Sequence, residues 1–147
     1  MKKEIDCVKE WCRVTEIPIA TDPQILNNDR AYLRFLLMKE ENEEYIEAAS
    51  KNDVVEIADA LGDMLYILLG TMLEHGMQNH IERVFGEIHR SNMSKMGEDG
   101  KPIRRKDGKI LKGPNYFRPN IKQILYEREK GEYTDPRSEN QGEERGY

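Results

Sequence analysis

The sequence predicts an all-α protein, a four- to five-helix antiparallel bundle with a small hairpin or ordered loop near its C-terminus. Three observations lead to this fold class. Apolar residues are concentrated between about residues 32 and 88, where they recur at helical spacing. Capping and turn residues divide this stretch into segments of helical length with short connections. After Gly97 the helical periodicity gives way to two Asp-Gly turn signals.

The first two helices are separated by a loop that contains two prolines. Residues 3–14 predict a short amphipathic helix, because their apolar side chains fall on one side of it. The loop TEIPIATDPQI follows. The second helix is expected over about residues 29–50, with Asn28 or Asp29 as its N-cap.

The next two helices have clear start and stop signals. Residues 51–53 make a tight turn, and Asp53 can cap a third helix over about residues 53–75. Gly76 is well placed to end that helix. A fourth helix is expected over about residues 78–96, closed by Gly97.

The C-terminal part has a different character. The turn signals at residues 99–101 and 107–109 predict the hairpin or ordered loop, and Asn120 can cap a last short helix through about Lys130. Residues 131–147 lack apolar periodicity and predict a disordered tail. Residues 1–130 are therefore expected to form one all-α domain.

Composition excludes several classes of protein. A net charge of -5 argues against a general nucleic-acid binder, and no run of apolar residues is long enough for a membrane span. The charged N-terminus lacks the apolar region of a signal peptide. Cys7 and Cys12 are not spaced as CxxC, so we expect both to be reduced thiols in the cytoplasm. Only 37% of residues are hydrophobic, so the small core favours a homodimer or homotetramer.

Carboxylates lie on the predicted core face of the second helix. On a 3.6-residue wheel, Glu41 and Glu44 fall on one stripe where a bundle helix normally places core residues. The other members of that stripe are Leu33, Leu37 and Ala48.

The third helix shows a similar arrangement. Asp59 and Asp63 share one stripe, and Glu56 precedes Asp63 by seven residues. Asp63 is followed by MLYILLGTML, which is apolar all round and predicts a segment buried on most sides.

Acids directed into one helical core predict a divalent metal centre. Like charges raise each other's pKa, and their burial costs free energy unless a positive group pairs with them. Mg²⁺, or alternatively Mn²⁺, prefers carboxylate oxygens and would relieve both effects. The alternative is a solvated glutamate-rich helix with partners such as Lys39 and Lys51. A metal held by carboxylates indicates chemistry on phosphates.

The acidic motifs also resemble those of a known superfamily. EENEE, at residues 40–44, is similar to the EExxE element of the all-α NTP pyrophosphatases, which include MazG-like proteins, dimeric dUTPases and phosphoribosyl-ATP pyrophosphohydrolase. ALGDMLYILLGT resembles the next core helix, with Asp63 at the Asp of ExxD. HRSNMSK and DGKILKGPNY resemble the C-terminal region of the MazG-like and dimeric-dUTPase-like branch. The resemblance covers about residues 5–120.

The chain departs from the family pattern at one position. Ala60 stands where the Glu of ExxD is expected, three residues before Asp63. Glu56 and Asp59 form an ExxD of their own one turn earlier. We infer that Asp59 supplies the missing carboxylate, with Glu56 as the reserve candidate.

The resemblance implies cleavage of a nucleoside triphosphate to its monophosphate and pyrophosphate. It implies Glu41, Glu44 and Asp63 as metal ligands and Glu40 as the base that takes a proton from water. The residues expected to contact substrate are Asn92, Lys95, Lys109 and Lys112. Trp11 either stacks on a base or packs the first helix against the others. The rival functions are a phosphoribosyl-ATP pyrophosphohydrolase of histidine biosynthesis and a non-enzymatic, metal-binding interaction module.

Overall fold

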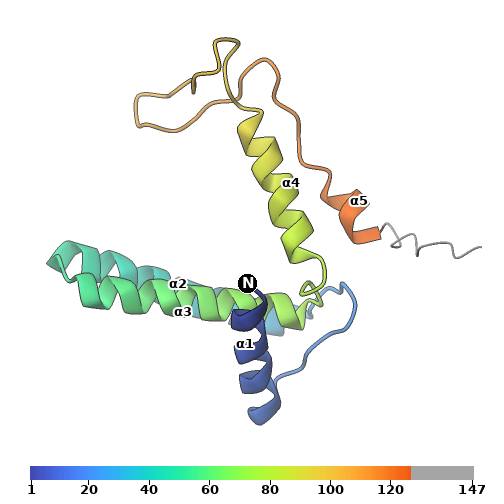
Figure 1. Cartoon of the computed structure of the whole chain (residues 1–147). Coiled ribbons are helices and arrows are strands. Elements are labelled where there is room, and N and C mark those ends of the chain that lie inside the picture. The colour runs from blue at the N-terminus through green and yellow to red at the C-terminus, as the bar shows by residue number, and fades with distance from the viewer. Residues whose placement is uncertain (127–147) are drawn as a thin grey trace, which may run out of the picture. The chain divides into compact units, whose positions relative to one another are not determined.

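The computed structural model describes residues 1–126 and contains five helices in this part of the chain (Figure 1). They are α1 (Lys2–Val14), α2 (Asn28–Lys51), α3 (Val54–Glu74), α4 (Ile81–Met93) and α5 (Ile121–Tyr126). The described residues form no strand, so the all-α class is confirmed. None of their helices has the length and apolar character needed to cross a membrane.

The chain divides into two compact units. The N-terminal unit is Met1–Gly86, and the C-terminal unit begins at Glu87. Of the latter, residues 87–126 are described. The prediction of a single domain over residues 1–130 remains a prediction, and the predicted disordered tail at residues 131–147 lies outside the described residues.

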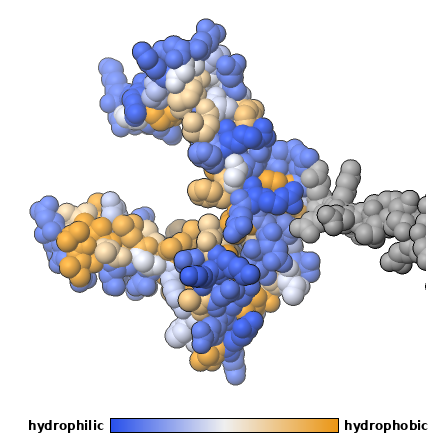
Figure 2. Space-filling view, viewed as in Figure 1, coloured by the Kyte–Doolittle hydropathy of each residue, from blue (hydrophilic) through white to orange (hydrophobic). Residues whose placement is uncertain are grey.

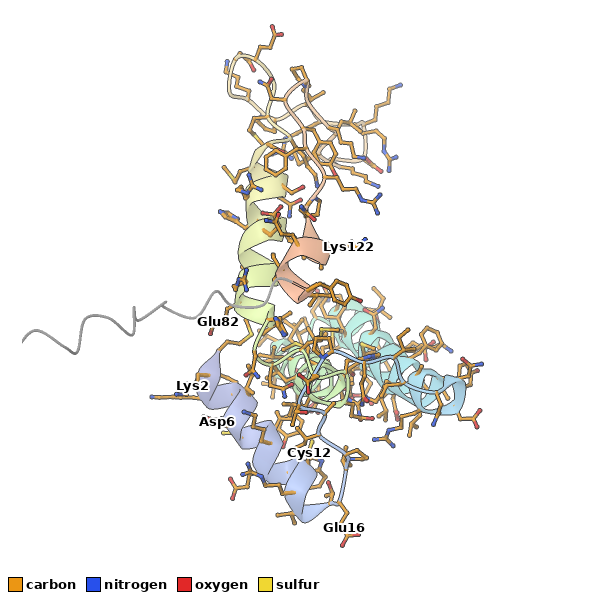
Figure 3. All side chains as sticks on the ribbon, turned by 90° about the vertical axis from the view of Figure 1, so that its right-hand side faces the viewer. Lys2, Asp6, Cys12, Glu16, Glu82 and Lys122 are labelled. Carbon is orange, nitrogen blue, oxygen red and sulfur yellow. The ribbon has the colours of Figure 1, made fainter. Side chains whose placement is uncertain are left out.

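The N-terminal unit is built on an antiparallel pair of helices. α2 and α3 lie side by side, and α1 packs against α3 and crosses it (Figures 1 and 3). The core forms where α1 meets the C-terminal half of α3, and it excludes water from apolar side chains of both helices. Its buried members are Ile5, Val8, Cys12, Leu69, Met72 and Leu73.

The turn between α2 and α3 agrees with the sequence, but the start of α2 does not. The carboxylate of Asp53 accepts hydrogen bonds from the backbone N–H groups of Val55 and Glu56, which confirms Asp53 as the N-cap of α3. The N-cap of α2 is Asn27, whose Oδ1 accepts from the Arg30 N–H at 2.8 Å. The prediction of Asn28 or Asp29 was therefore wrong by at least one residue, because three neighbouring positions carry a capping side chain.

Gly76 ends α3 as predicted. Its φ is +70°, and the Met77 N–H bonds the Met72 carbonyl at 2.9 Å in a Schellman arrangement. A Cβ at this position would lie 2.1 Å from the backbone oxygen of Asp22. Glycine is therefore required both for its conformation and for the close approach of the loop before α2.

α4 is shorter than predicted at both ends. It spans Ile81–Met93 rather than residues 78–96. At its C-terminus the Ser94 hydroxyl donates to the Ser91 carbonyl at 2.7 Å, which competes with the backbone bond that would continue the helix. The expected closure at Gly97 is wrong, since the Gly97 N–H bonds the Lys101 carbonyl at 2.8 Å within the following turn.

The described part of the C-terminal unit contains the second half of α4, an ordered loop and α5. Both Asp-Gly turns form, with Gly100 and Gly108 at positive φ, and two isolated bridges pair residues 96 with 102 and 104 with 110. The predicted hairpin or ordered loop is thus an ordered loop. Asn120 caps α5, because its Oδ1 accepts from the Gln123 N–H at 3.3 Å. The expected end of this helix near Lys130 lies outside the described residues.

Many large apolar side chains of α2 and α3 are exposed. Figure 2 shows apolar residues gathered over this helix pair toward its hairpin end. Leu65, Tyr66 and Leu68 are exposed, so the prediction that MLYILLGTML is buried on most sides is wrong for the single chain. The described residues cover the sides of that segment that face α1 and α2, and the buried Leu69 and Leu73 belong to the core formed with α1.

Candidate metal centre and its surroundings

Glu41 is the centre of the acidic residues in the N-terminal unit. The antiparallel pairing of α2 and α3 sets its carboxylate beside acids from both helices. Partial desolvation raises the pKa of Glu41, and the charges of Glu44, Asp63, Glu40 and Asp59 raise it further. The structure therefore brings these five residues into one electrostatic group, which we call the acidic site.

One carboxylate oxygen of Glu41 has no partner. Its Oε2 is inaccessible to water and makes no hydrogen bond. A buried carboxylate oxygen without a donor is costly, and here it also lies among like charges. This orphaned oxygen is the observation that best fits a cation ligand.

The remaining acids of the site are more open. Glu40, Glu44, Asp59 and Asp63 are exposed, contrary to the expectation that the clusters point into a closed core. Their exposure follows from the uncovered face of the α2–α3 pair. No group of three or more His, Cys, Asp or Glu side chains within residues 1–126 is already arranged to hold a metal ion. The donor types fit Mg²⁺ or Mn²⁺, but side chains must rotate to converge.

Glu56 lies apart from Glu41, closer to the hairpin turn. It lines an open cavity of about 290 Å³ together with Glu44, Glu47, Ala48 and Lys51. Lys51 pairs with Glu47 at 2.5 Å, and Glu56 is among the lesser charges that raise the Lys51 pKa. Glu56 therefore lines the same cavity as Lys51, whereas Asp59 is one of the charges that act on Glu41.

Ala60 is 2% exposed, so a carboxylate in its place would be buried within the helix pair. Asp59, in contrast, contributes to the charge around Glu41. This difference supports Asp59 as the replacement for the missing family carboxylate.

The predicted substrate-contacting residues all belong to the C-terminal unit. The Lys95 ammonium donates to Oδ1 of Asn92 at 2.6 Å. Lys112 lies over the ring of Tyr116, with its Nζ 4.5 Å from the centroid. Lys109 is exposed, and its backbone N–H donates to Asp107.

Charge is strongly divided along the chain. Residues 87–126 contain ten Lys and Arg against four Asp and Glu, whereas residues 1–86 contain nine against seventeen. The net charges are thus +6 and -8, which makes the second segment suited to anionic groups and the first to cations. The net charge of -5 for the whole chain does not reveal this difference between the two segments.

A buried ion network was missed in the sequence. Glu74 is 1% exposed and pairs with Arg30 through two hydrogen bonds, the one from Nη2 measuring 2.8 Å. Arg34 is also buried, with Nη1 at 3.5 Å from Glu74. Its Nε donates to the Thr71 hydroxyl at 2.9 Å and its Nη2 to the Ile67 carbonyl at 2.6 Å. The available signal was a lone Glu at the end of the uncharged segment that follows Asp63, together with two Arg at i,i+4 spacing on the preceding helix.

Comparison with known protein families identifies the family to which the central part of the chain is similar. The family model of phosphoribosyl-ATP pyrophosphohydrolase matches residues 9–92. The match covers 84 of the 147 residues and includes both acidic clusters. No curated protein matches the chain.

Proposed function

Because the chain belongs to the phosphoribosyl-ATP pyrophosphohydrolase family, we propose that it is a metal-dependent pyrophosphohydrolase that converts a (d)NTP to its monophosphate and pyrophosphate. Membership in this family, part of the MazG-like all-α NTP pyrophosphatase superfamily, makes the chain a hydrolase acting on acid anhydrides. The (d)NTP substrate is our proposal. The observation that carries the metal-dependent reaction is the orphaned Oε2 of Glu41 among four other acids.

The residues that would hold the metal are those of the acidic site. Family members generally depend on a divalent metal ion. Glu41, Glu44, Asp59 and Asp63 offer the hard oxygen donors that Mg²⁺ or Mn²⁺ prefers, and Glu56 is the reserve donor. When bound, the ion would neutralise charge on the phosphate oxygens and make the attacking water more acidic.

The protein's own groups have separate roles in this proposal. Glu40 is exposed and belongs to the acidic site, so its carboxylate can accept the proton of the attacking water. Asn92, Lys95, Lys109 and Lys112 would bind the polyphosphate, supported by the net charge of +6 in residues 87–126.

A panel of substrates tests the reaction. We expect incubation with dNTPs, NTPs and phosphoribosyl-ATP in Mg²⁺ or Mn²⁺ to yield monophosphate and pyrophosphate, separated by ion-exchange chromatography. Chelation with EDTA should stop the reaction. Nucleoside diphosphate and inorganic phosphate as products, or no product from any substrate, would refute the proposal.

The second candidate substrate is phosphoribosyl-ATP, and the name of the matching family favours it. The same panel decides between the two, because turnover of phosphoribosyl-ATP well above that of every (d)NTP would assign the enzyme to histidine biosynthesis. A metal-binding interaction module, the non-enzymatic rival, predicts binding of Mg²⁺ with no product from any of these compounds.

The exposed apolar side chains of α2 and α3 support a homodimer or homotetramer. Exposed apolar residues recur at helical spacing on each helix and form what we call the apolar stripes. Their members are Tyr32, Phe35, Leu36, Leu61, Leu65 and Leu68. A second copy would remove this surface from water.

We expect sedimentation at micromolar concentration to give at least a dimer. Leu65→Lys should shift the protein toward the monomer, because it places a charge within an apolar stripe. Ile25→Lys is the matched control, since Ile25 is 95% exposed and precedes α2. A monomeric wild type would contradict the oligomeric proposal.

We propose the cytoplasm as the location of the protein. Cys7 and Cys12 are both free, the first exposed and the second buried. Free thiols of this kind are usual in reducing compartments.

A further inference from the structure

The ordered loop between α4 and α5 doubles back on itself, and two of its arms pair (Figure 1). Residues 103–105 lie antiparallel to residues 109–111, joined by an isolated bridge and by two backbone hydrogen bonds of 2.8 Å each. The turn between the arms contains the second Asp-Gly pair, with Gly108 at positive φ. We call residues 101–112 the basic loop.

The basic loop carries many cations and almost no acid. Six of its twelve residues are Lys or Arg and one is Asp, so its net charge is +5. The cations are Lys101, Arg104, Arg105, Lys106, Lys109 and Lys112. Asp107 is already paired, since it accepts from Nε of Arg105 at 3.0 Å. The other five cations have no acidic partner among residues 1–126, and all of them are exposed.

The pairing of the arms separates Arg104 from the exposed apolar residues of the loop. Directly opposite residues of an antiparallel pair share a face, and successive residues alternate between faces. Arg104 lies opposite Ile110, so Ile103 and Leu111, which are 41% and 38% exposed, lie on the other face. The face of Arg104 therefore has no large exposed apolar side chain to enter a lipid layer, which argues against a membrane surface as the partner.

The aromatic rings next to the basic loop are already in use. Arg90 lies over the ring of Phe117, 4.3 Å from its centroid, and Lys112 lies over the ring of Tyr116. Neither ring is among the exposed residues. Proteins that bind single-stranded nucleic acids stack the bases on accessible aromatic side chains. The loop lacks such a platform, which favours a duplex, whose bases remain stacked on one another.

Duplex DNA matches both the charge and the shape of the basic loop. It carries about one negative charge for every 1.7 Å of its axis, which suits five unpaired cations on a short segment. Its major groove, about 12 Å wide, admits two paired chain segments, whereas the major groove of duplex RNA is too narrow for side chains to enter.

We propose that the basic loop binds duplex DNA through its phosphates, without regard to base sequence. This function is additional to the proposed hydrolysis, which uses Lys109 and Lys112 but has no role for Lys101, Arg104 or Lys106. The net charge of -8 in residues 1–86 repels DNA from that segment. For this reason the net charge of the whole chain does not indicate a DNA-binding protein.

Fluorescence anisotropy of a labelled DNA duplex, titrated with the full-length protein, tests the proposal. Counterion release by five cations predicts that the logarithm of the binding constant falls with the logarithm of salt concentration with a slope of about -4.5. The Kd at physiological salt is expected between about 1 and 100 μM. Absence of binding in this range would overturn the proposal. So would equal or tighter binding of single-stranded DNA, duplex RNA, poly-glutamate or anionic phospholipid vesicles, because the loop would then not select duplex DNA.

A matched pair of double variants tests the location. Arg104→Gln with Lys106→Gln should weaken DNA binding by about tenfold or more and make the salt slope smaller by about 2. Lys39→Gln with Lys51→Gln removes the same charge from α2, where each lysine pairs with an exposed glutamate, and should leave DNA binding unchanged. An unaltered slope in the first variant would place the DNA elsewhere and overturn the proposal.

Two further measurements separate DNA binding from folding and from hydrolysis. Circular dichroism shows whether each variant folds, and the comparison of polyanions with the wild type does not depend on any variant. Arg104→Gln with Lys106→Gln should retain pyrophosphate release from the nucleotide substrate, since neither residue is a proposed substrate contact. Loss of DNA binding with retained hydrolysis would confirm that the loop has a separate function.

Discussion

Glu41→Gln will lower turnover by at least about 100-fold, which corresponds to the loss of about 3 kcal/mol of transition-state stabilisation. The same change will raise the thermal midpoint of the metal-free protein. Glutamine keeps the size of the side chain but removes the charge that Glu44, Asp63, Glu40 and Asp59 oppose. Lower activity together with higher stability is the expected result when a residue is retained for catalysis although it destabilises the fold.

Glu43→Gln is the matched control for this prediction. Glu43 is on the same helix two residues away, but it is exposed and pairs with Lys39 at 3.3 Å. Its replacement should change neither turnover nor the thermal midpoint appreciably. The measurements are pyrophosphate release in Mg²⁺ and thermal unfolding in EDTA. Turnover retained in Glu41→Gln would remove Glu41 from the metal centre, and a lower midpoint would show that the carboxylate stabilises the fold.

Addition of Mg²⁺ provides a second comparison of the same variants. The wild type and Glu43→Gln should gain thermal stability from the ion, because a ligand that binds only the folded state stabilises it. Glu41→Gln should gain less. An equal gain in all three proteins would place the ion elsewhere.

The acidic site could be anticipated because it depends on local rules. Asp53 caps α3 through its own backbone neighbours, and the short turn then sets the antiparallel register of α2 and α3. Once this register is known, acids three or four residues apart on each helix must meet across the pair. The group around Glu41 follows from these two facts.

The buried stripe of α2 could be anticipated only in part. The wheel placed Leu33 in the core, yet Leu33 is 41% exposed and its neighbour Arg34 is buried. Hydrophobic periodicity assumes that a charged side chain stays in water, and this assumption fails where a distant acid compensates the charge. Glu74 is that acid, forty residues away in sequence, so no local pattern connects it to Arg34.

The C-terminal end of α4 involves contacts of the same distant kind in addition to the local bond between Ser94 and Ser91. The Ser91 hydroxyl donates to the Phe117 carbonyl at 2.8 Å, and Arg90 lies over the Phe117 ring, 4.3 Å from its centroid. These contacts join the end of the helix to a segment that follows more than twenty residues later. Gly97 was predicted to end the helix because glycine is common both just after helices and within turns, and the local sequence does not distinguish the two.

The ion network of Arg30, Arg34 and Glu74 leads to the second large effect. Glu74→Gln will destabilise the N-terminal unit by about 3–5 kcal/mol, the usual cost of removing one partner from a buried pair. Arg34 keeps its charge, since an arginine remains protonated in proteins, although burial lowers its pKa. The variant therefore leaves a cation in the interior that has lost its opposite charge. Urea unfolding at fixed protein concentration measures the change.

Two further variants separate the lost charge from lost packing. Glu47→Gln removes the acid of an exposed pair with Lys51 on α2 and should have little effect, because solvent screens that pair. The double variant Arg34→Met with Glu74→Leu should recover most of the stability lost in Glu74→Gln, since apolar side chains of similar volume can replace a buried ion pair. Arg30 then lacks its acid but remains 30% exposed, so water can solvate it. If Glu74→Gln were no less stable than Glu47→Gln, the network would contribute nothing to the fold, and the burial of Arg34 and Glu74 would need a functional reason.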